Sequence, residues 1–126
     1  MKWKQFVESS KSQVMVKPVC AKLEYDTETF GSMDVYCKLT VGGVTEKTSV
    51  AQDMGKNPQW EDKIVFTVSS EADQLHMAML DKDTFSDDYI CECWIPLFHD
   101  SDYESWYPVL REGKEVGKVM VCIDYL

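Results

Sequence analysis

The sequence contains no apolar run of about 18 residues, the length that a membrane-spanning helix needs. Its first residues, Met1 to Val7, have only scattered apolar side chains and do not resemble a secretory signal peptide. Lys2 stands where N-myristoylation requires glycine, and Cys122 lies one position too early for a prenylation motif. We therefore expect a soluble, cytoplasmic protein whose contact with membranes, if it has any, is peripheral.

Positive charge is scarce in this chain. Its 13 Lys and Arg residues stand against 22 Asp and Glu residues, which gives a formal net charge of −9 at pH 7. Such a chain is repelled by the phosphates of nucleic acid and by a bare anionic membrane, unless a local feature reverses the sign. Nucleic acid is therefore not an expected partner.

The five cysteines form no CxxC pair, and an odd number leaves one unpaired in any disulfide scheme. Most of them stand among apolar residues, so reduced and buried thiols in a cytosolic protein are the simplest interpretation. Cys91 and Cys93 share one face of a predicted strand, but no second Cys or His pair follows at zinc spacing. We expect no zinc site.

Catalytic motifs are also missing. The sequence has no G-x-S-x-G, P-loop or H-E-x-x-H motif, and neither His76 nor His99 stands in a nucleophile motif. Paired carboxylates can act on sugars, but acidic loop tips without an aromatic-walled cleft do not favour that chemistry. We do not expect an enzyme.

The chain does contain a series of segments in which apolar and polar residues alternate. Residues 34–41 alternate cleanly, and Gly42-Gly43 follows as a two-residue hairpin turn because glycine adopts the positive φ such turns need. The return strand is predicted over about residues 44–51, and the remaining strands at 14–21, 60–68, 74–80, 90–95, 106–110 and 118–125. Pro18 predicts an edge or a bulge in the first of these. We predict an all-β fold, an eight-stranded antiparallel β-sandwich of residues 12–126 after an N-terminal extension of residues 1–11.

The segment from Met79 to Ile90 has the most distinctive composition. It carries four carboxylates, at positions 81, 83, 87 and 88, with Phe85 between them. Such acids repel one another, and calcium relieves the repulsion because it accepts six to eight oxygen ligands from loops. A solvated acidic turn is the plain alternative. Phe85 argues against it, since an exposed ring gains nothing in water but gains from insertion into a lipid surface.

A second predicted loop repeats this composition, with Asp26, Glu28 and Asp34 around Phe30. Loops of a β-sandwich cluster at its two ends, so these two loops need only share an end to form one acidic cup. An EF-hand is the competing calcium motif for the later loop. It is not favoured, because Ser86 replaces the required glycine and the flanking segments alternate as strands.

Several motifs, in order, resemble the C2 domain family, a calcium- and phospholipid-binding sandwich. Residues 31–39, GSMDVYCKL, resemble the family's G-x-x-D-P-Y-V-K-L, and residues 47–50 and 57–60, KTSV and NPQW, resemble its K-T-x-V and N-P-x-W. Residues 81–90 resemble the family's third loop, and 94–97, WIPL, the strand after it. The resemblance extends over residues 12–126 and is strongest to small single-domain plant C2 proteins of the elicitor-responsive type.

The resemblance implies a Greek-key sandwich with a calcium site. The family's ligands fall on the side chains of Glu28, Asp34, Asp81, Asp83 and Asp88 and on the backbone carbonyl of Lys82. Glu28 stands where the family usually has Asp, which leaves Asp26 as an alternate ligand. The third loop is one residue short, which leaves Asp87 as an alternate to Asp88.

The resemblance also implies membrane-contacting tips at Phe30 and Phe85. Some members of the family carry a lysine-lined groove for inositol lipid headgroups, and Lys38 and Lys47 occupy matching positions here. Two lysines at strand spacing are, however, more often a solvated face.

The expected function is therefore calcium-dependent binding to anionic phospholipid membranes, by a monomer that becomes peripheral to the membrane when calcium binds. A protein partner is also possible on this interpretation. The alternative is a calcium-independent adaptor domain for proteins or lipids, since fold alone does not fix function. Calcium binding is favoured because an acid stands at every expected position.

Overall fold

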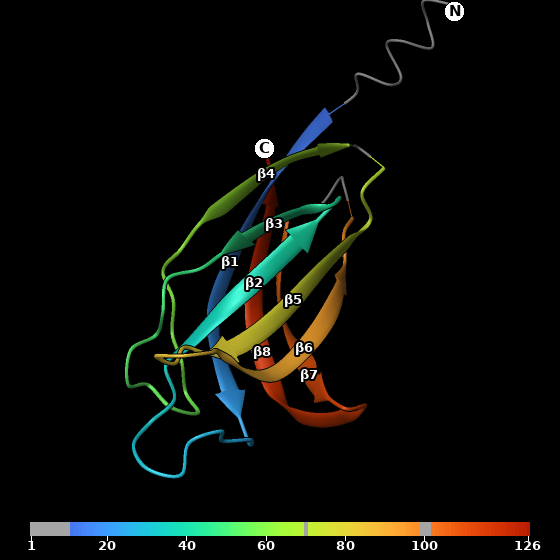
Figure 1. Cartoon of the computed structure of the whole chain (residues 1–126). Coiled ribbons are helices and arrows are strands. Elements are labelled where there is room, and N and C mark those ends of the chain that lie inside the picture. Colours follow the sequence, from blue (N-terminus) through green and yellow to red (C-terminus); the bar gives the residue numbers. More distant parts are fainter. Residues whose placement is uncertain (1–10, 70, 99–101) are drawn as a thin grey trace, which may run out of the picture.

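The computed structural model describes residues 11–69, 71–98 and 102–126. The described residues form eight antiparallel strands and no helix, and they therefore contain no helix that could span a membrane (Figure 1). The strands are β1 (Lys11–Leu23), β2 (Val35–Val41), β3 (Val44–Lys47), β4 (Ile64–Ser69), β5 (Gln74–Asp81), β6 (Asp88–Pro96), β7 (Tyr103–Arg111) and β8 (Lys114–Tyr125). Residues 1–10, most of the predicted extension, and His99 lie outside the described residues.

The strands follow the order β3-β2-β5-β6-β7-β8-β1-β4. Between β6 and β7 the pairing is reduced to Glu92 with Leu110, so the sheet turns there and folds into two four-stranded layers (Figure 1). The predicted eight-stranded antiparallel sandwich is confirmed. The non-consecutive neighbours, such as β1 between β8 and β4, give the crossing connections of a Greek key.

The core lies between the two layers. In β2, the alternate residues predicted to face inward are fully buried, and the alternate residues of β8 face them from the other layer. These inward residues are Val35, Cys37, Leu39 and Val41 of β2 and Val119, Val121 and Ile123 of β8. All five cysteines are free thiols, three buried and two half-buried, which agrees with the predicted apolar role.

The turn and bulge predictions also hold. Gly42 and Gly43 connect β2 to β3 with φ values of 55° and 82°, the left-handed conformation expected of this hairpin. β1 changes register between Pro18 and Cys20 opposite β8, because proline has no N–H to donate to the ladder.

Two strands are shorter than the alternation predicts. β3 ends at Lys47 because the Thr48 side chain replaces part of the ladder: its hydroxyl accepts a hydrogen bond from the Cys37 N–H at 2.9 Å. β4 begins only at Ile64. Trp60 precedes the strand as a buried side chain whose indole N–H donates to the Val35 carbonyl at 3.1 Å. Apolar alternation alone does not distinguish a buried side chain in a loop, such as Trp60, from a buried strand residue.

Candidate metal centre

Strand register places the acidic residues at one end of the sandwich. Asp81, the last residue of β5, pairs with Val35 on one side and with Asp88, the first residue of β6, on the other. Asp34 immediately precedes Val35, so the first loop ends beside Asp81, and the second loop begins and ends beside it. The prediction that the loops at 24–33 and 81–89 share one end is confirmed.

Asp81 forms the base of this acidic end. It is only 1% exposed, and its two carboxylate oxygens accept hydrogen bonds from the Asp34 N–H at 2.8 Å and from the Thr27 hydroxyl at 2.5 Å. A buried carboxylate is stabilised by such donors. Asp81 therefore ties the loop after β1 to the end of β5.

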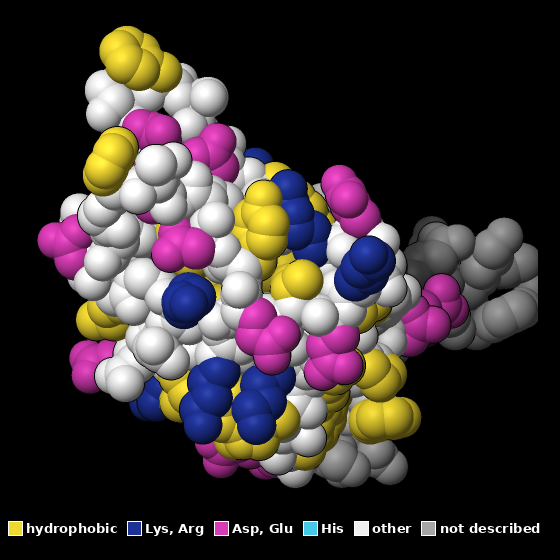
Figure 2. All heavy atoms as spheres, turned by 90° about the horizontal axis from the view of Figure 1, so that it is seen from below, with side chains coloured by type: hydrophobic (Ala, Val, Ile, Leu, Met, Phe, Trp, Pro, Cys, Tyr) yellow, Lys and Arg dark blue, Asp and Glu magenta, His cyan; other side chains and the backbone are white. Residues whose placement is uncertain are grey.

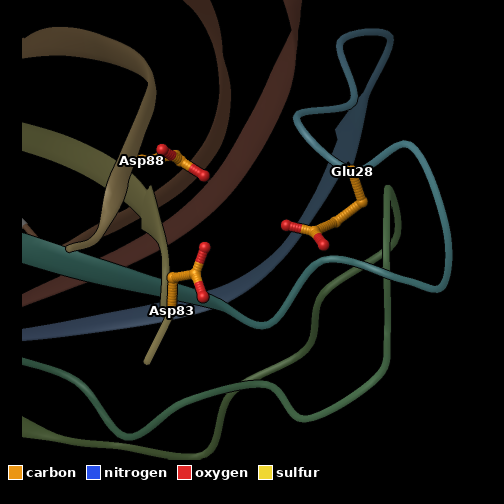
Figure 3. Close-up of side chains that lie close together, drawn as sticks. All are labelled: Glu28, Asp83 and Asp88. Carbon is orange, nitrogen blue, oxygen red and sulfur yellow. The ribbon is translucent and has the colours of Figure 1, made fainter. Parts of the chain in front are cut away.

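Three acidic side chains converge above this base. Glu28, Asp83 and Asp88 come from the loop after β1, the loop after β5 and the start of β6, and their carboxylates point toward a common space (Figure 3). One oxygen from each lies within 4.8 Å of the others. Calcium–oxygen bonds of 2.3–2.6 Å place two ligands of one ion at most about 5 Å apart, so these three acids fit a calcium ion.

Asp34 stands beside this group. With Glu28, Lys82, Asp83 and Thr84 it lines a hollow of about 370 Å³, which has room for an ion with bound water. One Asp34 oxygen accepts a hydrogen bond from the Asp53 N–H at 2.7 Å, which fixes the orientation of the carboxylate.

The two alternate ligands point elsewhere. Asp26 accepts a hydrogen bond from the Glu28 N–H at 2.9 Å and so shapes the local turn. Asp87 accepts hydrogen bonds from the Tyr36 hydroxyl and from the Asp83 N–H, and it lies 3.8 Å from the Lys82 ammonium. The Tyr36 hydrogen bond is the main reason that the pKa of Asp87 is lowered. Asp88, and not Asp87, faces Glu28 and Asp83.

The cluster has an excess of negative charge. The pKa of Glu28 is raised to about 7, chiefly because its protonated carboxyl hydrogen-bonds to Asp81 and because the Asp81 charge repels a second negative charge. Asp83 and Asp88 add smaller repulsions. Near neutral pH, a fraction of the molecules therefore carries a proton on Glu28, at the place where a cation could bind.

Two aromatic rings project beside the acids. Phe30 is 89% exposed and Phe85 is 97% exposed, on the two loops that supply Glu28 and Asp83. Figure 2 looks onto this end of the molecule, where hydrophobic and acidic side chains stand next to each other. Two exposed rings next to an acidic cluster make this end of the molecule a candidate interaction surface.

The two predicted groove lysines lie opposite each other, Lys38 on β2 and Lys47 on β3. The Lys47 ammonium is 5.9 Å from the centre of the Tyr36 ring. A small hollow of about 120 Å³ includes Lys47 but not Lys38, and Asp87 lines it as well. An acid thus already stands beside one of the two lysines.

Thr27 and Tyr36 are site residues that the sequence prediction did not include. Thr27 has no signal of its own, because its bond to Asp81 depends on how the loop folds. Tyr36 stands in the same motif as Asp34 and on the outward face of a strand, a position from which a polar tip could have been expected to reach the loop.

The fold and the acidic loop end define a β-sandwich domain with a candidate site built from loops. The family model described as the C2 domain matches residues 12–109, and the chain belongs to the C2 domain family.

Similar proteins agree with this assignment. The chain is 31% identical over 112 residues to the 16 kDa phloem protein 2 of Arabidopsis thaliana, a match that covers 85% of this chain and 76% of that protein. It is 29% identical over 112 residues to the elicitor-responsive protein 3 of Oryza sativa subsp. japonica, covering 85% and 78%. A solved structure of a C2 domain-containing protein from a putative elicitor-responsive gene superposes with a TM-score of 0.77 at 29% identity, covering 91% and 88%. The predicted resemblance to small plant C2 proteins is confirmed.

Proposed function

We propose that this domain is a calcium-dependent module that binds anionic phospholipid membranes with its loop end, as a cytoplasmic monomer without catalytic activity. The observation that carries the proposal is the convergence of Glu28, Asp83 and Asp88 within 4.8 Å, beside the exposed rings of Phe30 and Phe85. Membership of the C2 family supports it.

The residues that would hold calcium are Glu28, Asp34, Asp81, Asp83 and Asp88, with the backbone carbonyl of Lys82. Oxygen ligands of this kind suit a hard cation, and the hollow beside them accommodates water or a lipid oxygen. Bound calcium supplies positive charge that cancels the carboxylates and attracts phosphate or carboxylate oxygens of the lipid.

Calcium would act through the local charge of the loop end and not through the net charge of the whole domain. With a net charge of −9, the chain stays negative even with two divalent ions bound. Repulsion between the loop end and an anionic leaflet is strongest where the acids gather, and it falls within a Debye length of about 8 Å. Neutralising the cluster therefore lets the two Phe side chains of the same loops approach the bilayer.

A calcium titration by calorimetry tests the metal site. We expect a dissociation constant on the order of 10⁻⁶ to 10⁻⁴ M without lipid. The double variant Asp81→Asn/Asp83→Asn should lose most of this affinity. Glu71→Gln/Asp73→Asn is a control with the same change of charge. Both acids are exposed and lie just before the start of β5, whereas Asp81 lies at its end. Equal affinity in all three proteins would refute the site.

Sedimentation with vesicles containing phosphatidylserine tests the membrane function. Binding should require calcium and disappear in chelator. Equal binding in both conditions would instead support the calcium-independent adaptor, because a proton on Glu28, whose pKa is raised to about 7, already removes part of the repulsion that calcium would relieve.

A further inference from the structure

Arg111, the last residue of β7, contacts two segments that neighbour the proposed ligands in the sequence. One guanidinium nitrogen donates to the Tyr89 carbonyl at 2.8 Å and to the Ile90 carbonyl at 3.1 Å. The same guanidinium lies 4.0 Å from the centre of the Tyr25 ring. The β7–β8 hairpin that carries it turns at the end of the sandwich where the loops lie (Figure 1).

These contacts fall next to the proposed ligands. Tyr25 lies just after β1 and three residues before Glu28, and Tyr89 follows Asp88 directly. Arg111 thus joins the segment that carries Glu28 to the strand start that carries Asp88. We propose that Arg111 is a positioning residue that holds these two acids at calcium-binding separation, an inference that rests on the proposed calcium function.

The sheet explains why a side chain is needed here. Pairing between β6 and β7 consists of Glu92 with Leu110 in the described part of the chain, so the start of β6 has no strand ladder on that side. The Tyr89 and Ile90 carbonyls receive their hydrogen bonds from Arg111 instead. On its other side the start of β6 pairs with β5, and Ile90 packs in the core, so Arg111 is what holds the carbonyls on the β7 side.

Arginine suits this position better than lysine. Its planar guanidinium can stack on one ring while its N–H groups donate in the plane, whereas an ammonium cannot do both. The charge itself works against calcium, because a fixed positive group near the acids weakens the binding of a cation. If Arg111 positions the acids, its replacement should lower the calcium affinity. If only its charge matters, its loss should raise that affinity.

The experiment compares calcium affinity in three variants of the full chain by calorimetry. Arg111→Met removes the donors and the charge, and we expect calcium affinity to fall about tenfold, as for other residues that orient metal ligands. Arg111→Lys keeps the charge but loses the stacked fork, and its affinity should fall as well. Lys114→Met is the matched control, because Lys114 pairs with Arg111 across the same hairpin and its loss removes the same charge. Its affinity should stay equal or rise.

A second measurement needs no calcium. In the calcium-free protein, Arg111→Lys should change the NMR shifts of the Tyr25 ring protons and speed amide hydrogen exchange at the start of β6, whereas Lys114→Met should not. Should Arg111→Met fail to fold, Arg111→Lys carries both measurements.

The outcomes separate the two hypotheses. If both Arg111 variants bind calcium at least as tightly as the parent protein, the positioning role is wrong. If the parent protein binds no calcium, the proposed function fails. The calcium-free measurement then shows whether Arg111 still holds the two segments, and unchanged ring shifts and exchange would reject that as well.

Discussion

Replacing Phe85 with alanine should separate membrane retention from calcium binding. The ring is 97% exposed on the loop that carries Asp83, and it has no partner in the described structure that its removal would disturb. The free energy of unfolding and the calcium affinity measured without lipid should therefore match those of the parent.

The magnitude of the membrane effect follows from the area that the ring can bury. Full burial of a Phe side chain contributes about 1.5–3 kcal/mol, and a loop tip in the interface buries part of it, about 1–2 kcal/mol. Because 1.4 kcal/mol is a factor of ten, vesicle partitioning in calcium should fall about 5- to 30-fold. Phe30→Ala should have a similar effect, since Phe30 is 89% exposed on the neighbouring loop.

Sedimentation over a range of lipid concentrations measures this partitioning. Phe98→Ala is the matched control, because Phe98 is 57% exposed just beyond the opposite end of β6 and should not touch the bilayer. An unchanged partition coefficient for Phe85→Ala would refute insertion of the ring. A loss of calcium affinity without lipid would show that the ring supports the site instead.

Four further predictions concern the acid cluster, the backbone and the thiols. Because the pKa of Glu28 is raised to about 7, calcium must displace a proton, so its affinity should fall from pH 8 to pH 6 and calorimetry should detect proton release. Without calcium, the same raised pKa contributes stability that is complete below about pH 4.5 and is lost as the pH rises through 7, a trend that urea titrations across this range can check. Gly117→Ala should lower the free energy of unfolding by about 2–3 kcal/mol, since its Cβ would lie 2.2 Å from the Lys22 carbonyl oxygen, whereas Gly113→Ala meets no atom and should cost only about 1 kcal/mol. Native Cys37, Cys91 and Cys93 should react slowly with thiol reagents because burial raises the pKa of each, and stoichiometric bound zinc would contradict this apolar role.

Much of the architecture could be predicted from the order of residues along the chain. Alternation in residues 34–41 identified β2 because a strand with one buried face must repeat every second residue. Gly42-Gly43 identified the hairpin because few residues other than glycine adopt its backbone angles. The two acidic loops with aromatic tips, together with the family motifs, indicated where a site would be built.

The assignment of individual acids needed the folded chain. Asp87 and Asp88 are neighbours of identical chemistry, and they differ in surroundings because the Tyr36 hydroxyl, 51 positions away, donates to Asp87. Asp81 was predicted as one ligand among five, yet its burial and its donors Thr27 and Asp34 make it the base of the cluster. Arg111 gave no signal, since its partners Tyr25 and Tyr89 become neighbours only through packing. A backbone preference is a property of adjacent residues, whereas the direction of a carboxylate depends on donors that only tertiary contacts bring to it.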